Sequence, residues 1–204
     1  MLDYLEHLQQ MLVKDFYQLY DRYQDDEIYA CSLVFDEFLL LDDLAISTER
    51  SFFQAPEDPQ QYLAERDRWN VRKWRYKSQS SSQSELVPFK TWLAEYFKTQ
   101  HSFGHPVLAQ QKQLPATHLD LLLETFKQAK RKLSEAYGLD LDSIIFFLSV
   151  PNQPEVEHQS ALELNSDSRL LQDFLASRQT LSQSTVNKRL KLSQSDKAIL
   201  IDLE

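Results

Sequence analysis

Apolar residues at the start of the chain recur every three or four positions, which places them on one face of a helix. They are Leu5, Leu8, Leu12, Phe16, Leu19 and Tyr23. The acidic triplet at 25–27 ends this pattern. The same spacing predicts a longer helix from about Thr117 to Tyr137, and Gly138 follows it where glycine commonly closes a helix.

Two other apolar runs have the length and composition of strands. The run Ile28–Phe35 is rich in β-forming residues, and Asp-Glu at 36–37 predicts a tight turn into a second strand over 38–46. This hairpin lacks the glycine that two-residue turns favour. The run Ile144–Val150 is almost wholly apolar, which is typical of a strand covered on both faces. We predict that it lies at the centre of the same sheet.

Two shorter helices complete the predicted elements. Pro88 begins one of them, with an apolar face made of Phe89, Trp92, Leu93, Tyr96 and Phe97. Asn165 or Ser166 is a candidate cap for the other, whose apolar face holds Leu170, Leu171, Phe174 and Leu175. Helices and strands are therefore mixed along the chain. The fold class is α+β, or a mixed α/β sheet flanked by helices.

Polar segments divide the chain into a domain and a tail. The tract Ser78–Ser84 contains no apolar residue, so we expect a mobile loop near 78–85 within a single domain that spans 1–178. The segment 179–204 is a polar tail, and its apolar stretch 198–201 is a candidate edge strand.

Composition excludes several classes of site. The 204 residues include only two glycines, so no phosphate-binding loop, dinucleotide fingerprint or glycine-flanked nucleophile can be written. The single cysteine, Cys31, excludes an intrachain disulfide and a multi-cysteine zinc site. It lies within a predicted strand, where a small buried thiol usually packs and does not react. We expect no cofactor.

Charge and hydropathy suggest the compartment and the partners. The chain begins with acidic residues and no basic leader, and no apolar run approaches the length of a membrane span. We therefore expect a cytoplasmic protein without a membrane partner. With 22 Lys and Arg against 31 Asp and Glu, the net charge of −9 disfavours nucleic-acid binding and suits a basic protein partner.

The segment from Tyr62 to Lys77 concentrates basic and aromatic residues. With Asn70 as a helix cap, Trp69 before the cap and Trp74 at the fourth helical position can close a hydrophobic staple that buries both indoles. We favour this interpretation, since aromatic residues at such spacing usually pack. The alternatives are an aromatic and basic platform that stacks a nucleic-acid base, and a surface for an acidic partner.

Four short motifs follow one another along the chain: Ile28-Tyr29-Ala30, Ser47-Thr48-Glu49, Arg68-Trp69 with Trp74 and Tyr76, and Ala161-Leu162-Glu163-Leu164-Asn165. In this order they resemble the bacterial domain-of-unknown-function family numbered 4303. Its corresponding motifs read "iYafaL", "nTee", "RWspaEWaye" and a terminal "LN" before a helix. The resemblance covers most of the chain from about Asp15 to Phe174.

The resemblance carries no catalytic role, because the family is named for lacking an established activity. Val71 and Lys73 replace the Pro and Glu of the family's tryptophan element, which removes part of its capping box. Family members are small bacterial accessory proteins, some of them beside toxin-immunity genes. The resemblance therefore implies an accessory role of the immunity type.

Candidate ligand-binding residues are those where polar or aromatic groups follow predicted elements. Thr48, Trp69, Trp74 and Asn165 are predicted to converge on any pocket, although capping and packing are their first roles. His101 and His105 are spaced like two metal ligands on a helix. Gly104 lies between them and no carboxylate accompanies them, so a polar loop is favoured over a metal site.

Two functions are compatible with these observations. The first is a protein-binding domain of the toxin-immunity type, whose acidic charge would speed association with a basic effector. The second is a small-molecule binder or an enzyme whose site is assembled from dispersed polar residues. No recognisable catalytic signature favours the second function.

Overall fold

The structure is a computed structural model that describes residues 2–36, 40–52, 63–91 and 116–178. Its strands are β1 (Ile28–Phe35), β2 (Leu41–Thr48), β3 (Tyr76–Lys77) and β4 (Ile145–Ser149). Its longer helices are α1 (Leu2–Tyr23), α3 (Ala116–Tyr137) and α4 (Pro154–Leu164), and residues 86–91 and 169–178 are also helical. Short 3-10 turns are η1 (Gln24–Asp26), η2 (Glu49–Phe52), η4 (Glu65–Asp67), η5 (Val71–Lys73) and η6 (Ser78–Ser80).

The described strands form one mixed sheet in the order β3-β2-β1-β4. β1 pairs with β2 as an antiparallel hairpin, and β2 pairs with β3 in the same sense. β1 and β4 are parallel, with Cys31 beside Phe146, because α3 carries the chain back across the sheet between them. The predicted α+β fold of a single domain is confirmed.

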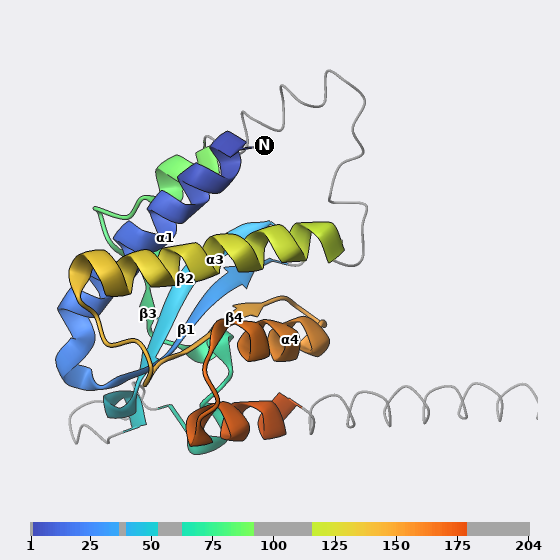
Figure 1. Ribbon diagram of the computed structural model, residues 1–204. Helices are drawn as coiled ribbons and strands as arrows, with labels where there is room; N and C mark the ends of the chain where they lie inside the picture. Colours follow the sequence, from blue (N-terminus) through green and yellow to red (C-terminus); the bar gives the residue numbers. More distant parts are fainter. Residues whose placement is uncertain (1, 37–39, 53–62, 92–115, 179–204) are drawn as a thin grey trace, which may run out of the picture.

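Helices α1 and α3 lie side by side on one face of the sheet (Figure 1). Side chains alternate along β4 with a period of two, as in any strand. Phe146 and Leu148 face the two helices, and Phe16 of α1 and Phe126 of α3 both pack against the Phe146 ring. The buried apolar residues on this face form the larger of two hydrophobic cores.

The opposite face of the sheet carries a second core. Ile145 and Phe147 of β4 point to this side, where α4, the helix 169–178 and the tryptophan segment cover them (Figure 1). Both faces of β4 are thus buried, which explains its uninterrupted apolar sequence.

Two predictions about the sheet are wrong in detail. β4 is the outermost described strand and not a central one, and side chains occupy its outer edge in place of another strand. The hairpin turn is longer than two residues, since the Asp36 amide donates to the Leu40 carbonyl at 2.9 Å. A longer turn does not need the glycine that a two-residue turn favours.

Helix α4 is not among the predicted elements. The sequence pattern indicates only that Pro151 and Pro154 end a strand, but Pro154 also occupies the first turn of α4, where a missing N–H costs nothing. The next helix covers residues 169–178, and its cap is Ser168, whose hydroxyl accepts from the Leu171 amide at 3.1 Å. Asn165 instead ends α4, so neither Asn165 nor Ser166 caps the later helix.

The predicted long helix is confirmed as α3, and Gly138 adopts a left-handed conformation (φ 66°) immediately after it. Its amide donates to the Ser134 carbonyl at 3.0 Å, which closes the helix. The predicted helical face over 92–97, the tail 179–204 and the candidate strand 198–201 lie outside the described residues.

The Ser/Gln tract at 78–84 is anchored at both ends, contrary to the expectation that it buries nothing. Ser78 and Ser84 are buried, and their hydroxyls donate to the carboxylates of Asp43 (3.2 Å) and Asp15 (2.6 Å). A run of small hydroxyl residues suggests a solvated loop, but here two of these residues satisfy two buried acids. Residues 79, 80, 82 and 83 are exposed between these anchors.

Candidate functional site

Both tryptophans of the predicted site are buried in the second core. Trp69 and Trp74 make edge-to-face contacts with Tyr29, at centroid distances of 5.3 and 6.5 Å. The indole of Trp74 donates to the Arg68 carbonyl at 2.9 Å, so its polar edge is satisfied internally. Their burial agrees with the structural interpretation and leaves neither ring as an exposed stacking platform.

The local geometry differs from the predicted staple. Only one 3-10 turn, Val71–Lys73, follows Asn70, and the Asn70 side chain makes no capping hydrogen bond to that turn. Trp69 and Trp74 are held through Tyr29 on β1 and not through a helix of their own.

Thr48 ends β2 and is fully buried. Its hydroxyl lies 2.9 Å from that of Ser51 in the 3-10 turn that follows, so it stabilises the exit from the strand. The neighbouring Ser47 hydroxyl lies 2.8 Å from the Tyr29 hydroxyl, which also donates to the Arg68 carbonyl at 2.7 Å. Burial raises the pKa of Tyr29 above its ordinary value, so this phenol remains a neutral donor.

Asn165 occupies the outer edge of β4. Its carboxamide accepts from the Phe146 amide (2.8 Å) and donates to the Phe146 carbonyl (2.7 Å), as the peptide group of a neighbouring strand would. It also donates to the Ala161 carbonyl at 2.8 Å and thereby closes α4. Further along the same edge, the Ser160 hydroxyl accepts from the Leu148 amide at 3.0 Å.

The four candidate residues do not line one common pocket. Asn165 lines the largest pocket that we describe, whereas Thr48, Trp69 and Trp74 line none of the described pockets. His101 and His105 lie outside the described residues. Among the residues that are described, no group of three or more His, Cys, Asp or Glu side chains is arranged to hold a metal ion.

Cys31 lies in the middle of β1 with no exposed surface. Burial raises the pKa of its thiol above the ordinary value, with a smaller opposing effect from the positive charge of Lys130. A thiol that resists ionisation is a poor nucleophile, so Cys31 has the properties of a packing residue.

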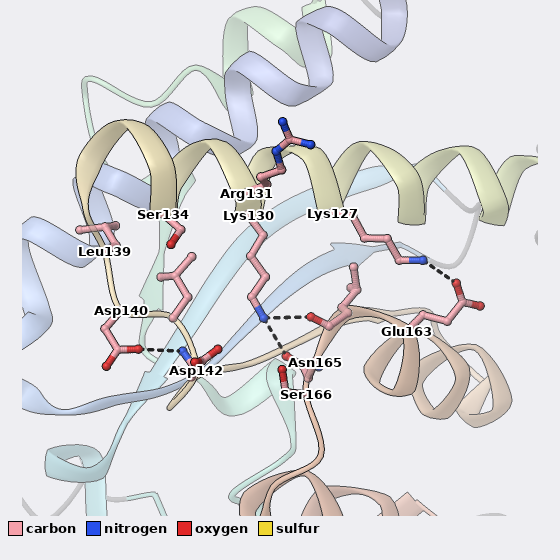
Figure 2. A pocket seen from close by; sticks show the side chains of 12 residues that line it. Lys127, Lys130, Arg131, Ser134, Leu139, Asp140, Asp142, Glu163, Asn165 and Ser166 are labelled. Atoms are coloured by element: carbon pink, nitrogen blue, oxygen red, sulfur yellow. Dashed lines mark hydrogen bonds and ion pairs between the residues drawn. The ribbon is translucent and has the colours of Figure 1, made fainter.

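The largest of the described pockets has a volume of about 470 Å³ and opens between α3, the segment 139–142 and the end of α4 (Figure 2). Lys127 binds Glu163 across its rim at 3.0 Å. Lys130 reaches down from α3 and donates to the Leu164 carbonyl at 2.9 Å, with Asn165 Oδ1 at 3.5 Å. Asp140 accepts from the Asp142 amide at 3.2 Å on the opposite wall.

A second pocket, of about 380 Å³, opens where α1 ends and β1 begins. Its lining includes three carboxylates, Glu27, Glu49 and Asp140, with two tyrosines, Tyr20 and Tyr29, and no lysine or arginine. We call this the acidic pocket.

The carboxylates of the acidic pocket differ in their ion pairs. Glu49 binds the Arg68 guanidinium, which also lies 4.2 Å from the centre of the Tyr29 ring. Glu27 and Asp140 form no salt bridge with any residue that the structure describes. The acidic pocket therefore has negative charge to offer to a cation.

Sequence reasoning did not single out Lys130 or Glu27, and it favours a cap or a turn as the role of the Asp140/Asp142 pair. Lys130 is one of several basic residues on α3, and only the packing of α4 against that helix distinguishes it. Glu27 has a left-handed backbone conformation (φ 58°), which no local sequence motif predicts. The acidic run before β1 and the Asp140/Asp142 pair before β4 are visible in the sequence, and parallel pairing of these strands brings them to the same end of the sheet.

Comparison of the chain with family models, with curated proteins and with solved structures found no match. Within the described part of the chain, no helix has both the length and the apolar character that crossing a bilayer requires.

Proposed function

We propose that this protein is a binding domain that captures a basic protein partner through the acidic pocket. The observation that carries the proposal is that two carboxylates, Glu27 and Asp140, line one pocket with the half-buried ring of Tyr20, and that the lining contains no lysine or arginine. Carboxylates and aromatic faces are the groups that bind a lysine or arginine side chain.

The surroundings of the acidic pocket support this role. Asp21 and Asp25 are exposed on the last turn of α1 and on η1, beside the pocket residue Gln24. Arg22 and Arg50 are exposed at the same end; the Arg50 guanidinium binds Asp26 at 2.9 Å, and that of Arg22 lies 5.9 Å from the centre of the Tyr23 ring. The acidic character of this end adds to the net charge of −9, which favours rapid encounter with a basic protein.

An immunity-type accessory protein would use such a surface to hold a basic effector. The resemblance to the family numbered 4303 supports the same role. The alternative, a small-molecule site, would draw on the larger pocket between α3 and α4, which shares Asp140 with the acidic pocket.

The first experiment measures binding of a fluorescent hexa-arginine peptide by anisotropy, at low salt and over a salt series. The Glu27→Gln/Asp140→Asn double variant is expected to bind about fivefold more weakly, since each exposed charge pair contributes up to about 1 kcal/mol. Affinity of the wild type should fall as salt rises.

The matched control removes the same charge elsewhere. Glu6 and Asp120 are exposed near the starts of α1 and α3, at the other end of these helices, so Glu6→Gln/Asp120→Asn should leave binding unchanged. Equal weakening by both double variants would mean that net charge alone attracts the peptide, and the proposal would be wrong. The next step is co-purification of the protein with basic products of neighbouring genes. A partner that binds the acidic pocket should be lost with Glu27→Gln/Asp140→Asn and retained with Glu6→Gln/Asp120→Asn.

A further inference from the structure

Lys130 is placed differently from the other basic residues of α3. Its side chain is half-buried, and its Nζ lies 4.6 Å from the centre of the Phe146 ring in the larger core. Lys127, one turn earlier, binds Glu163 at the rim, and Arg131 binds Glu135 and points away from the pocket in Figure 2. Lys130 is thus the amine that the pocket presents at its floor.

Lys130 has few polar partners among the described residues. Leu164 O accepts from Nζ at 2.9 Å, and Asn165 Oδ1 lies at 3.5 Å, the outer limit of a hydrogen bond. The Phe146 ring, whose centre lies 4.6 Å from Nζ, attracts the ammonium form. An ammonium group has three N–H donors, so these contacts replace only part of the water that surrounds an exposed lysine.

The charged groups around Lys130 do not outweigh its burial. Burial lowers the pKa of this lysine below its ordinary value, and the opposing attraction of the Asp142 carboxylate is smaller. Lys127 and Arg131 flank Lys130 on α3, and each is neutralised by a salt bridge, Lys127 with Glu163 of α4 and Arg131 with Glu135. Asp140 lies on the facing segment. Lysines desolvated in this way are those that act as nucleophiles.

We propose that Lys130 is a nucleophilic amine that forms an imine with a small aldehyde bound in the pocket of about 470 Å³. The Nζ lone pair forms a bond to the carbonyl carbon, and one amine proton moves to the carbonyl oxygen to give a carbinolamine. The second amine proton leaves as the C–O bond breaks, so that water is released and a C=N bond remains. No oxidant or reductant is needed. Asp142 lines the same pocket and its charge acts on Lys130, so it is the carboxylate that we assign to relay these protons, through water.

A purely structural role for Lys130 makes a different prediction. As a cap on the last carbonyl of α4, Lys130 would stabilise the helix end while remaining no more reactive than an exposed lysine. The reactivity of the amine therefore separates the two roles.

The experiment treats the full-length folded protein with butanal and cyanoborohydride, which reduces any imine to a stable secondary amine, and maps the adducts by mass spectrometry. We expect Lys130 to be labelled about fivefold faster than the exposed Lys132 on the same helix, because desolvation leaves more of its amine uncharged. The pH midpoint of labelling should be lower for Lys130 than for Lys132.

Two variants sharpen the result. Lys130→Arg keeps a cation at the end of α4 and should abolish labelling at this position while leaving Lys132 unchanged. Ser134→Phe fills the pocket from its α3 wall and should slow labelling of Lys130 alone. Labelling of Lys130 no faster than of Lys132, or with the same pH midpoint, would overturn the proposal. Asp140 lines both pockets, but neither readout uses a basic ligand and neither variant changes a residue of the acidic pocket, so failure of this proposal is distinguishable from failure of basic-partner binding.

Discussion

Asp43 is a fully buried carboxylate whose two oxygens have different surroundings. Oδ1 accepts from the Ser78 hydroxyl (3.2 Å) and from the amides of Gln79 (3.3 Å) and Leu44 (2.9 Å). Oδ2 is buried with no hydrogen-bond partner among the described residues. Burial raises the pKa of Asp43 above its ordinary value, and the hydrogen bonds oppose this only in part.

Replacing Asp43 with Asn tests how much folding stability is lost when this buried carboxylate ionises. Because the folded-state pKa of Asp43 is raised, folding takes up a proton between the unfolded-state pKa and the folded-state pKa, and stability is lost as pH rises through that window. The Asp43→Asn variant has no carboxylate to ionise at this position, so it escapes this loss. Its stability relative to wild type should rise between about pH 4 and pH 7, by about 1.4 kcal/mol for every tenfold difference in proton affinity between the folded and unfolded states.

Thermal and urea melts of both proteins at the two pH values measure this difference. The exposed Asp173→Asn serves as the control and should show no such trend. A relative stability that is the same at both pH values would show that Asp43 ionises in the folded protein as easily as in the unfolded chain.

At the scale of elements, the sequence predicts the long helices and the first strand, but not the position of β4 in the sheet or the existence of α4. α1 and α3 each have an apolar pattern with the helical period, and β1 is a continuous run of residues typical of strands. The position of β4 is not predictable from its own residues, because burial on both faces produces the same apolar run at the centre of a sheet or at a covered edge. α4 escapes prediction because a proline that ends one element can begin another.

Substitution of Trp74 tests how strongly the second core stabilises the packing of its elements on the sheet. Only 3% of its surface is exposed, and its ring packs edge-to-face on Phe147 of β4 at 5.8 Å. Trp74→Ala should lower the free energy of unfolding by about 3–5 kcal/mol through lost transfer energy and the cavity left behind. Urea unfolding monitored by circular dichroism measures the change.

The control for this substitution is Val87→Ala, at a residue with 57% of its surface exposed, which should change stability little. An unchanged midpoint for Trp74→Ala would contradict the packing of this ring in the second core and would favour the exposed platform instead.

At the scale of the whole molecule, the tract 78–84 ties α1 to the sheet. Ser84 and the Glu85 amide bind Asp15 of α1 at 2.6 and 2.7 Å, while Ser78 binds Asp43 of β2. The predicted convergence of the candidate-site residues also belongs to this scale, and the four residues do not line one described pocket. Thr48, Trp69, Trp74 and Asn165 each have a local role that their motifs indicate, but convergence depends on tertiary packing that short motifs do not encode.

Removing one anchor should open this tract. Asp15→Ala deletes two hydrogen bonds to a charged acceptor, each contributing about 1.5–3 kcal/mol, so cleavage by subtilisin within 79–85 should accelerate by about tenfold or more. Mass spectrometry of the first fragments locates and times the cut. Asp21→Ala, an exposed change on the same helix, is the control. Equal cleavage of Asp15→Ala and wild type would show that the tract is not held by these contacts.

The side-chain amide of Asn165 has a consequence for how copies of this protein meet one another. β4 carries a run of apolar residues, Ile145-Phe146-Phe147-Leu148, of the kind that adds to other strands and seeds cross-β aggregates when its edge is open. Asn165 already bonds both polar backbone groups of Phe146, and Ser160 bonds the Leu148 amide. A second chain would have to displace these side chains before it could pair with β4. Two polar residues on and just after one helix thus protect the edge of this apolar strand without adding another strand to the sheet.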